Sequence, residues 1–323
     1  MENNLIVTTS PHLKHPTTTA DIMRDVLIAL APASVAAVII HGWYALLMII
    51  VTTAAAVLAE LVFNLAIKKE QTVGDLSAAV TGLLLALNLS TKTELWQCVI
   101  GAVFAIVVVK CLFGGIGCNF ANPAITARIF MLIAFVSIGG GALGGDPFSG
   151  SFGDLVGGAT PLEALKNNVP TTELPTLLDM FLGNRGGAIG EGCALALIIG
   201  GIYLVARRVI KWQVPVAFIG TVFVFSWIYT GDIISALYYV LAGGLVIGAI
   251  FMATDYATTP LNTLGKVVFA IGAGLITVLI RFFGSYPEGV SFAILIMNIL
   301  SPYIEKLTMK RPFGAIGGNK NEK

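Results

Sequence analysis

Residues 43–66 read WYALLMIIVTTAAAVLAELVFNLA, and the only charged side chain in this stretch is Glu60. At about 1.5 Å of rise per residue, an α-helix of this length reaches across the roughly 30 Å of hydrocarbon in a bilayer. The stretch therefore predicts a membrane-spanning helix. It sets the fold class, because a chain assembled from such runs is an integral membrane protein.

The composition of the whole chain agrees with this interpretation. Of 323 residues, 56% are hydrophobic and 11% are charged, whereas about a quarter of the residues in an average soluble domain are charged. The mean hydropathy is +0.88. We therefore expect an all-α polytopic membrane protein. The net charge of +1 and the lack of a long basic run give no indication of nucleic-acid binding.

Apolar segments recur along the chain, and we expect about ten transmembrane helices. The third and the tenth are short for a bilayer that needs about 20 residues, and short, interrupted segments are typical of broken or re-entrant helices around a site. The expected helices cover residues 22–40, 43–66, 74–89, 94–112, 123–140, 187–206, 212–230, 233–253, 264–283 and 289–306.

The distribution of lysine and arginine predicts the orientation. With ten crossings and a cytoplasmic amino terminus, 15 of these residues fall on the cytoplasmic side and 4 outside, a strong positive-inside bias. The polar start of the chain predicts no cleavable signal peptide. The expected parts are a cytoplasmic arm, a first membrane repeat of helices 1 to 5, an outer loop, a second repeat of helices 6 to 10 and a cytoplasmic tail, at 1–21, 22–140, 141–186, 187–306 and 307–323.

Faint similarities between the two halves suggest an internal repeat. Phe113-Gly114-Gly115 before the fifth helix resembles Phe283-Gly284-Ser285 before the tenth, at an offset of 170 residues. Five helices are an odd number, so a second repeat would be inverted in the membrane, as in many transporters. We expect two inverted five-helix repeats.

The outer loop contains one hydroxyl among residues with almost no side chain, in the stretch SFGDLVGGATPLE at 151–163. Gly157, Gly158 and Ala159 leave the oxygen of Thr160 accessible, and Pro161 stiffens the backbone after it. One interpretation is a loop turning into a helix, with Thr160 as N-cap and Pro161 at the first helical position. The other is a site that a large group approaches, or to which it is attached.

The second interpretation is supported by a resemblance. Asp154, Gly158, Ala159, Thr160 and Leu162 match a motif that resembles the flavinylation motif of the RnfD and NqrB subunits of ion-pumping redox complexes. The resemblance implies that Thr160 carries FMN through a phosphoester. The chain departs from the motif at Gly157, where the family usually has Ser or Thr.

Further family-like motifs extend over nearly the whole chain, around Gly74-Asp75, Asn122-Pro123, Thr254-Asp255 and Tyr286-Pro287-Glu288. The total length resembles RnfD more than the longer NqrB. The stretch GGIGCNFANP at 114–123 has two interpretations. It is a glycine turn whose asparagines cap the fifth helix. Alternatively, Asn119 and Asn122 hydrogen-bond a flavin ring on which Phe120 stacks. The resemblance implies a second, noncovalent flavin, riboflavin, near this side.

No catalytic residue set and no metal-ligand pattern stands out. The four cysteines lack CxxC spacing, and we interpret them as packing residues. Charges within apolar segments either pair and cap, or mark a path for Na⁺ or H⁺. They are Glu60, Asp75, Glu191, Asp232 and Asp255.

The resemblance therefore implies an electron-transfer membrane subunit of an Rnf-type complex that couples ferredoxin:NAD⁺ oxidoreduction to Na⁺ or H⁺ translocation. It implies location in the bacterial inner membrane, with both termini cytoplasmic, and partner subunits that carry iron–sulfur and flavin groups. The chain has no dinucleotide fingerprint of its own. The alternative function is an inverted-repeat solute channel or transporter without a cofactor.

Overall fold

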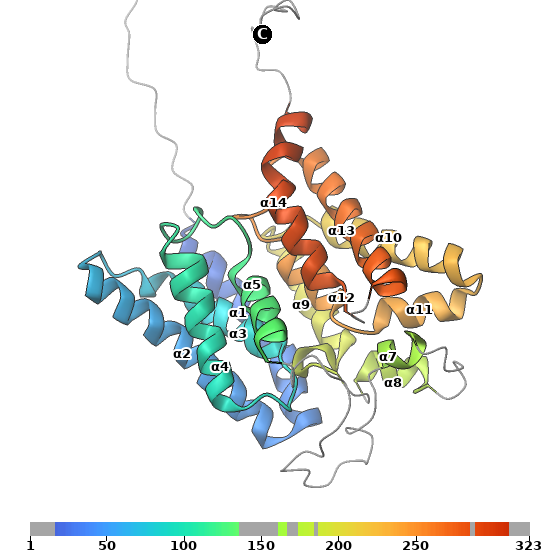
Figure 1. Cartoon of the computed structure of the whole chain (residues 1–323), viewed down its shortest axis with the longest axis horizontal. Coiled ribbons are helices and arrows are strands. Elements are labelled where there is room, and N and C mark those ends of the chain that lie inside the picture. The colour runs from blue at the N-terminus through green and yellow to red at the C-terminus, as the bar shows by residue number, and fades with distance from the viewer. Residues whose placement is uncertain (1–16, 136–160, 167–173, 184–186, 285–287, 310–323) are drawn as a thin grey trace, which may run out of the picture.

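The computed structural model describes residues 17–135, 161–166, 174–183, 187–284 and 288–309. Within these ranges the chain is helical, and its β-structure is a single isolated bridge between Ser90 and Ala188. Figure 1 shows the helices of the first half, in blue and green, beside those of the second half, in yellow to red.

The first half contains two long helices followed by three shorter ones. The fourth helix is α-helical as α4 and then continues as a π-helical segment, η2. The elements are α1 (Thr19–His41), α2 (Trp43–Ile67), α3 (Ser77–Leu87), α4 (Leu95–Val103), η2 (Phe104–Cys111) and α5 (Pro123–Ala134).

The second half again has five principal helical units, and its third unit is broken. Two short helices precede the second half. The elements are α7 (Pro161–Lys166), α8 (Leu177–Leu182), α9 (Ala194–Ala206), α10 (Gln213–Thr230), α11 (Ile233–Leu241), α12 (Leu245–Ile247) with its π-helical continuation η5 (Gly248–Met252), α13 (Thr263–Phe283) and α14 (Val290–Thr308).

Each of the ten expected segments contains a helix or a bent helix pair. Among the described residues, five helices are long and apolar enough to cross a membrane, or six if the bent pair counts as one span. The third helix is short, as expected. The tenth is not, because α14 runs through Pro302 to Thr308 and has 19 residues.

Three helices are shorter than expected, and the first is α3, which covers Ser77–Leu87 of the expected 74–89. Residues 187–193 do not belong to the sixth helix, because they form the bridge at Ala188 and a 3₁₀ turn, η4 (Ile189–Glu191). The fifth helix ends at Ala134, and residues 136–140 lie outside the described ranges.

The third unit of the second half is interrupted between α11 and α12, where the axis bends by 67°. Gly243 adopts φ +70°, a left-handed conformation that suits glycine. The break leaves carbonyl groups of α11 without intrahelical partners. Arg281 of α13 donates to two carbonyl oxygens there, those of Tyr239 and, at 3.1 Å, Ala242.

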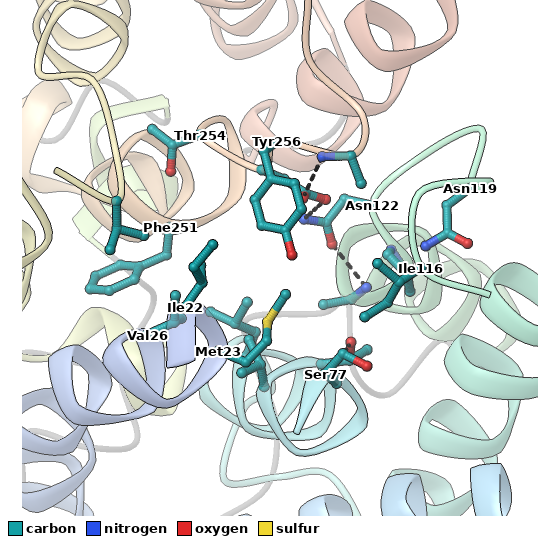
Figure 2. A pocket seen from close by; sticks show the side chains of 18 of the residues that line it. Ile22, Met23, Val26, Ser77, Ile116, Asn119, Asn122, Phe251, Thr254 and Tyr256 are labelled. Atoms are coloured by element: carbon teal, nitrogen blue, oxygen red, sulfur yellow. Dashed lines mark hydrogen bonds between the residues drawn. The ribbon is translucent and has the colours of Figure 1, made fainter. Parts of the chain in front are cut away.

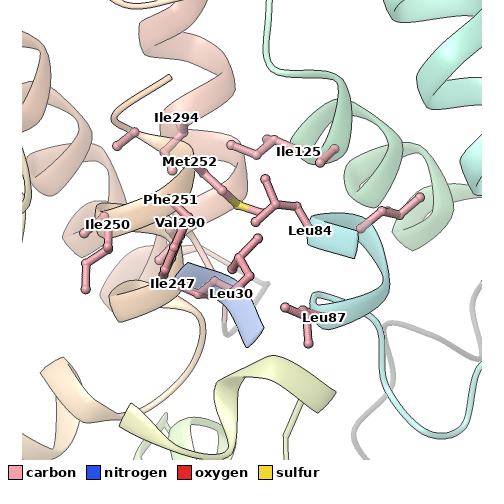
Figure 3. Close-up of a cluster of buried hydrophobic side chains, with 14 of the residues drawn as sticks. Leu30, Leu84, Leu87, Ile125, Ile247, Ile250, Phe251, Met252, Val290 and Ile294 are labelled. Carbon is pink, nitrogen blue, oxygen red and sulfur yellow. The ribbon is translucent and has the colours of Figure 1, made fainter. Parts of the chain in front are cut away.

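The two halves use the same packing pattern. In the first half α2 packs against α3 and α4, and in the second half α10 packs against α11 and α13. Helix α1 packs against α9, its counterpart in the order of the second half, and α5 packs against α14. The core lies where the halves meet, and Figure 3 shows Leu30, Leu84, Ile125, Met252 and Ile294 converging there from five elements.

Close backbone approach holds α1 to α9. Gly200 of α9 faces Ala29 of α1, and a Cβ at Gly200 would collide with the carbonyl oxygen of Ala29. Small residues at such crossings let membrane helices gain van der Waals contact where hydrophobic driving force is weak. Gly220 of α10 is a useful contrast, because nothing lies within 4 Å of the position that its Cβ would take.

We expect Gly200→Ala to destabilise the protein by about 1–3 kcal/mol, the range for overpacked sites. Gly220→Ala is the matched control. It should be neutral or stabilising, because alanine favours a helix over glycine by up to about 1 kcal/mol. The measurement is the temperature at which half of the detergent-solubilised protein aggregates. Equal midpoints for the two variants would contradict the proposed contact.

Candidate functional site

A pocket with a largely apolar lining and a few polar side chains lies at one end of the interface between the two halves. It has a volume of about 100 Å³ and is formed by the first turns of α1 and α3, the end of η2, the 112–122 loop, and residues 254–257 after η5. Figure 2 shows Met23, Asn122 and Tyr256 around it, with Asn119 further out beyond Ile116. The pocket therefore brings together motifs from both halves of the chain.

Asn122 caps α5. Its Oδ1 accepts hydrogen bonds from the backbone N–H groups of Ala124 at 3.0 Å and Ile125 at 3.4 Å, and Pro123 occupies the first turn. The helix-capping interpretation of this asparagine is confirmed. Its Nδ2 donates to Asp255 across the pocket at 3.5 Å, which joins the loop of the first half to that of the second.

Asn119 also lines the pocket, and its Oδ1 is buried without a hydrogen-bond partner among the described residues. A buried oxygen of this kind costs free energy until a donor reaches it. Phe120 lies elsewhere. Its ring is exposed and packs against Phe113, with 4.9 Å between the ring centroids, and does not line the pocket.

A buried ion pair forms another part of the wall. Lys110 of η2 is 2% exposed, and its Nζ donates to Oε1 of Glu60 at 2.7 Å and to Oγ of Ser77 at 2.5 Å. The same Glu60 oxygen accepts from Thr72 at 2.7 Å. Ser77 in turn donates to Asp75 at 2.5 Å. Pairing accounts for Oε1 of Glu60 and capping for Asp75, whereas Oε2 of Glu60 is buried without a hydrogen-bond partner among the described residues.

Asp255 faces the pocket from the second half. Its carboxylate accepts from the backbone N–H of Ala257 at 3.1 Å and from the hydroxyl of Thr258 at 3.2 Å. Burial raises the pKa of this carboxyl, and these two hydrogen bonds oppose the rise. Asp232, by contrast, caps α11, and the hydrogen bonds from Ser235 and Ile234 lower the pKa of its carboxyl.

A second buried cluster lies at the other end of α3. Arg128 of α5 donates to Oδ1 of Asn88 at 2.7 Å, to Glu191 at 3.3 Å and to Glu288. Arg128 and Glu191 are buried. A Cβ at Gly244 would contact both, so the glycine at the α11–α12 break makes room for them. One guanidinium thus joins α3, α5, η4 and the start of α14.

The outer-loop residues of the flavinylation-like motif up to Thr160 lie outside the described residues; among them are Asp154, Gly158 and Ala159. A helix does begin at Pro161, as the loop-to-helix interpretation predicts. Leu162 and Leu165 of this helix, α7, are buried near the break between α11 and α12. They pack against Tyr238, Tyr239 and Ala242. Lys166 donates to the carbonyl oxygen of Gly284 at 2.5 Å.

The sequence pattern did not reveal the role of three cations in these clusters. The positive-inside count includes Lys110 and Arg128 among the cytoplasmic charges and Arg281 among the outer ones, but all three are buried. A signal was present, because each stands within an otherwise apolar segment, where an isolated charge is costly. Their partners are 33 to 160 residues away in sequence, so spacing gave no indication of the pairs.

These features define a multi-pass membrane protein with polar sites between its halves. Comparison with known proteins then identifies its relatives. Residues 6–314 match the model of the NQR2, RnfD, RnfE family, and the chain belongs to that family.

Relatives match over nearly their full length. The D subunit of the Na⁺-translocating ferredoxin:NAD⁺ oxidoreductase complex of Acetobacterium woodii is 42% identical over 100% of this chain and 99% of its own. The D subunit of the proton-translocating ferredoxin:NAD⁺ oxidoreductase complex of Clostridium ljungdahlii is 39% identical over 97% of each chain. The D subunit of an ion-translocating oxidoreductase complex of Halorhodospira halophila is 36% identical over 94% of each.

We expect Arg128→Met to destabilise the protein by about 3–5 kcal/mol, because it removes the buried guanidinium that contacts Glu191 and Glu288. Adding Glu288→Gln should recover part of the loss by removing one unpaired carboxylate. Arg207→Met is the control, because the Arg207–Asp25 pair has an exposed guanidinium and should matter far less. Thermal aggregation of the solubilised protein measures all three. Similar losses for Arg128→Met and Arg207→Met would refute the assignment.

Proposed function

We propose that this protein is the electron-transfer membrane subunit of an Rnf-type complex, which couples ferredoxin:NAD⁺ oxidoreduction to translocation of Na⁺ or H⁺. The observation that carries the proposal is similarity over essentially the whole chain to proteins named as the D subunit of such complexes. The proposed partners are the other membrane and peripheral subunits, including those with iron–sulfur and flavin groups. They would contact ferredoxin and NAD.

The first proposed cofactor is FMN, joined to Thr160 by a phosphoester. The motif supports this assignment, with Asp154, Gly158 and Ala159 around the acceptor. The described structure adds that the residue bonded to Thr160, Pro161, begins a helix whose leucines are buried in the protein. A cofactor attached there would be held close to an anchored element.

The second proposed cofactor is riboflavin, bound without a covalent bond in the pocket between the two halves. The oxygen of Asn119, which has no hydrogen-bond partner among the described residues, fits an N–H donor of a flavin ring, and the amide of Asn122 supplies a donor on a neighbouring wall. The volume of about 100 Å³ is below the roughly 300–1,000 Å³ of typical small-molecule sites. The ring would therefore displace side chains such as the flexible Met23. Phe120 has no part in this version of the site.

We further propose ten crossings in two inverted five-helix repeats, with both termini on the cytoplasmic side of the bacterial inner membrane. The common packing pattern of the halves supports the repeats. Removing the three buried cations from the charge count leaves thirteen lysines and arginines against three, so the positive-inside bias persists. The pocket then lies toward the cytoplasm and α7 toward the outside.

Helix α3 separates the pocket from the Arg128 cluster. It has 11 residues and a length of about 16 Å, roughly half the hydrocarbon thickness. When bound, the flavins supply the redox chemistry. The residues of this chain would hold the pocket flavin and exclude water from it.

Thr160→Ala should abolish covalent attachment of flavin because it removes the only acceptor oxygen of the motif, whereas Thr160→Ser should retain at least part. Thr171→Ala, in the same loop, is the control and should retain all of it. The measurements are intact mass and flavin fluorescence of the denatured chain, produced in a host with the flavin transferase. Bound flavin that survives denaturation in the alanine variant would exclude Thr160, and a colourless wild type would favour the transporter alternative.

Asn119→Ala should weaken retention of the noncovalent flavin by about 1–3 kcal/mol, the cost of one lost hydrogen bond to a buried group. Asn122→Ala should lose flavin and also about 0.5–2 kcal/mol of stability, because it removes the cap of α5. Phe120→Leu is the control and should keep the flavin. Noncovalent flavin released on denaturation is quantified by chromatography. Full retention in both asparagine variants would place the second flavin elsewhere.

A further inference from the structure

We propose that the Lys110–Glu60 pair determines which form of flavin the pocket accepts, by cancelling the one cation in its wall and so selecting an uncharged flavin over a phosphorylated one. The inference rests on the proposed function of the pocket as a flavin site. It adds the residues that set its specificity.

The charges around the pocket are unequal. Among the described residues that line it, the only ionisable groups of Asp, Glu, Lys or Arg type are Lys110 and Asp255. The hydrogen-bond partners of the lining residues add two carboxylates, Glu60 on Lys110 and Asp75 on Ser77. The lining residues and these partners thus contain one ammonium group and three carboxylates.

The ammonium of Lys110 is committed to its partners. Two of its three donors go to Glu60 and Ser77, and the ammonium and the Glu60 carboxylate are both almost fully buried. The π-helical segment η2 ends immediately after Lys110, and such local widenings of a helix are frequent at functional sites. The nearby Lys69 is exposed and donates to the carbonyl oxygen of Gly114, in the loop that leads to Asn119.

This arrangement disfavours anionic ligands. A phosphate monoester carries close to two negative charges at neutral pH. In a partly buried site the effective dielectric constant is far below that of water, so repulsion from the carboxylates extends over several ångströms. Riboflavin and FMN differ only in this phosphate. A pocket without a free cation therefore binds riboflavin in preference to FMN.

The test changes the two members of the pair separately. Glu60→Gln keeps a hydrogen-bond acceptor for Lys110 but removes the compensating charge, whereas Lys110→Met removes the cation. The double variant Glu60→Gln/Lys110→Met removes both charges. Each solubilised full-length protein is incubated with equal amounts of riboflavin and FMN, and the noncovalent flavins that it retains are separated by chromatography.

We expect the wild type to retain mainly riboflavin. Glu60→Gln should raise the ratio of FMN to riboflavin about tenfold or more, Lys110→Met should lower it, and the double variant should return it toward the wild-type value. The opposite signs exclude a merely structural effect, because loosened packing would move both single variants in one direction. Single variants that shift the ratio in the same direction, or not at all, would overturn the inference.

The test separates this inference from the proposal on which it rests. A wild-type protein that retains neither flavin without a covalent bond would refute the flavin pocket itself. A wild type that retains riboflavin, with ratios unchanged in the variants, would refute only the role of the Lys110–Glu60 pair.

Discussion

Hydrocarbon offers no water to satisfy a polar group, so every charge and every open carbonyl between these helices needs a partner from the protein. Three buried cations meet that need. Lys110 pairs with Glu60, and Arg128 contacts two glutamates and an asparagine. Arg281 donates hydrogen bonds to carbonyl oxygens at the end of the broken helix. Short and broken helices are stable in a membrane because these side chains provide hydrogen-bond partners for the polar groups at their ends. The shape of the protein follows from this requirement.

Lys110 and Arg281 also have corresponding places in the two halves. Each lies near the carboxyl end of the fourth unit of its half, and each reaches toward the short or broken third unit, Lys110 to Ser77 at the start of α3 and Arg281 to the end of α11. In an inverted arrangement the two cations would stand at opposite membrane faces. A buried cation that contacts the third unit of its half would then lie beside the pocket at one face and beside α7 at the other.

The sequence predicted the positions of the ten helical segments well, because long apolar runs such as 43–66 require a helix in a bilayer. Local chemistry offered helix capping as one of two interpretations for Asn122 and for Asp232, and the structure has them as the caps of α5 and α11. The sequence pattern missed the bend between α11 and α12, because a glycine pair inside an apolar run can continue a helix or break it, and only Arg281 from a later helix stabilises the break. One interpretation of the sequence stacked Phe120 on a flavin ring, whereas Phe120 is exposed, packs against Phe113 and does not line the pocket. The role of Thr160 rests on the motif alone.

The seating of α7 has a consequence for how a tethered cofactor would behave. Two buried leucines and the Lys166 contact fix this helix immediately after Thr160, the proposed attachment residue. A group joined to Thr160 would be tethered to α7 through about one residue. Such a short tether does not allow the group to move over long distances. Its local concentration at a nearby partner would be high and constant, as short linkers dictate. Any large movement in turnover would then fall to the neighbouring subunits, which would have to come to the tethered group to collect or deliver electrons.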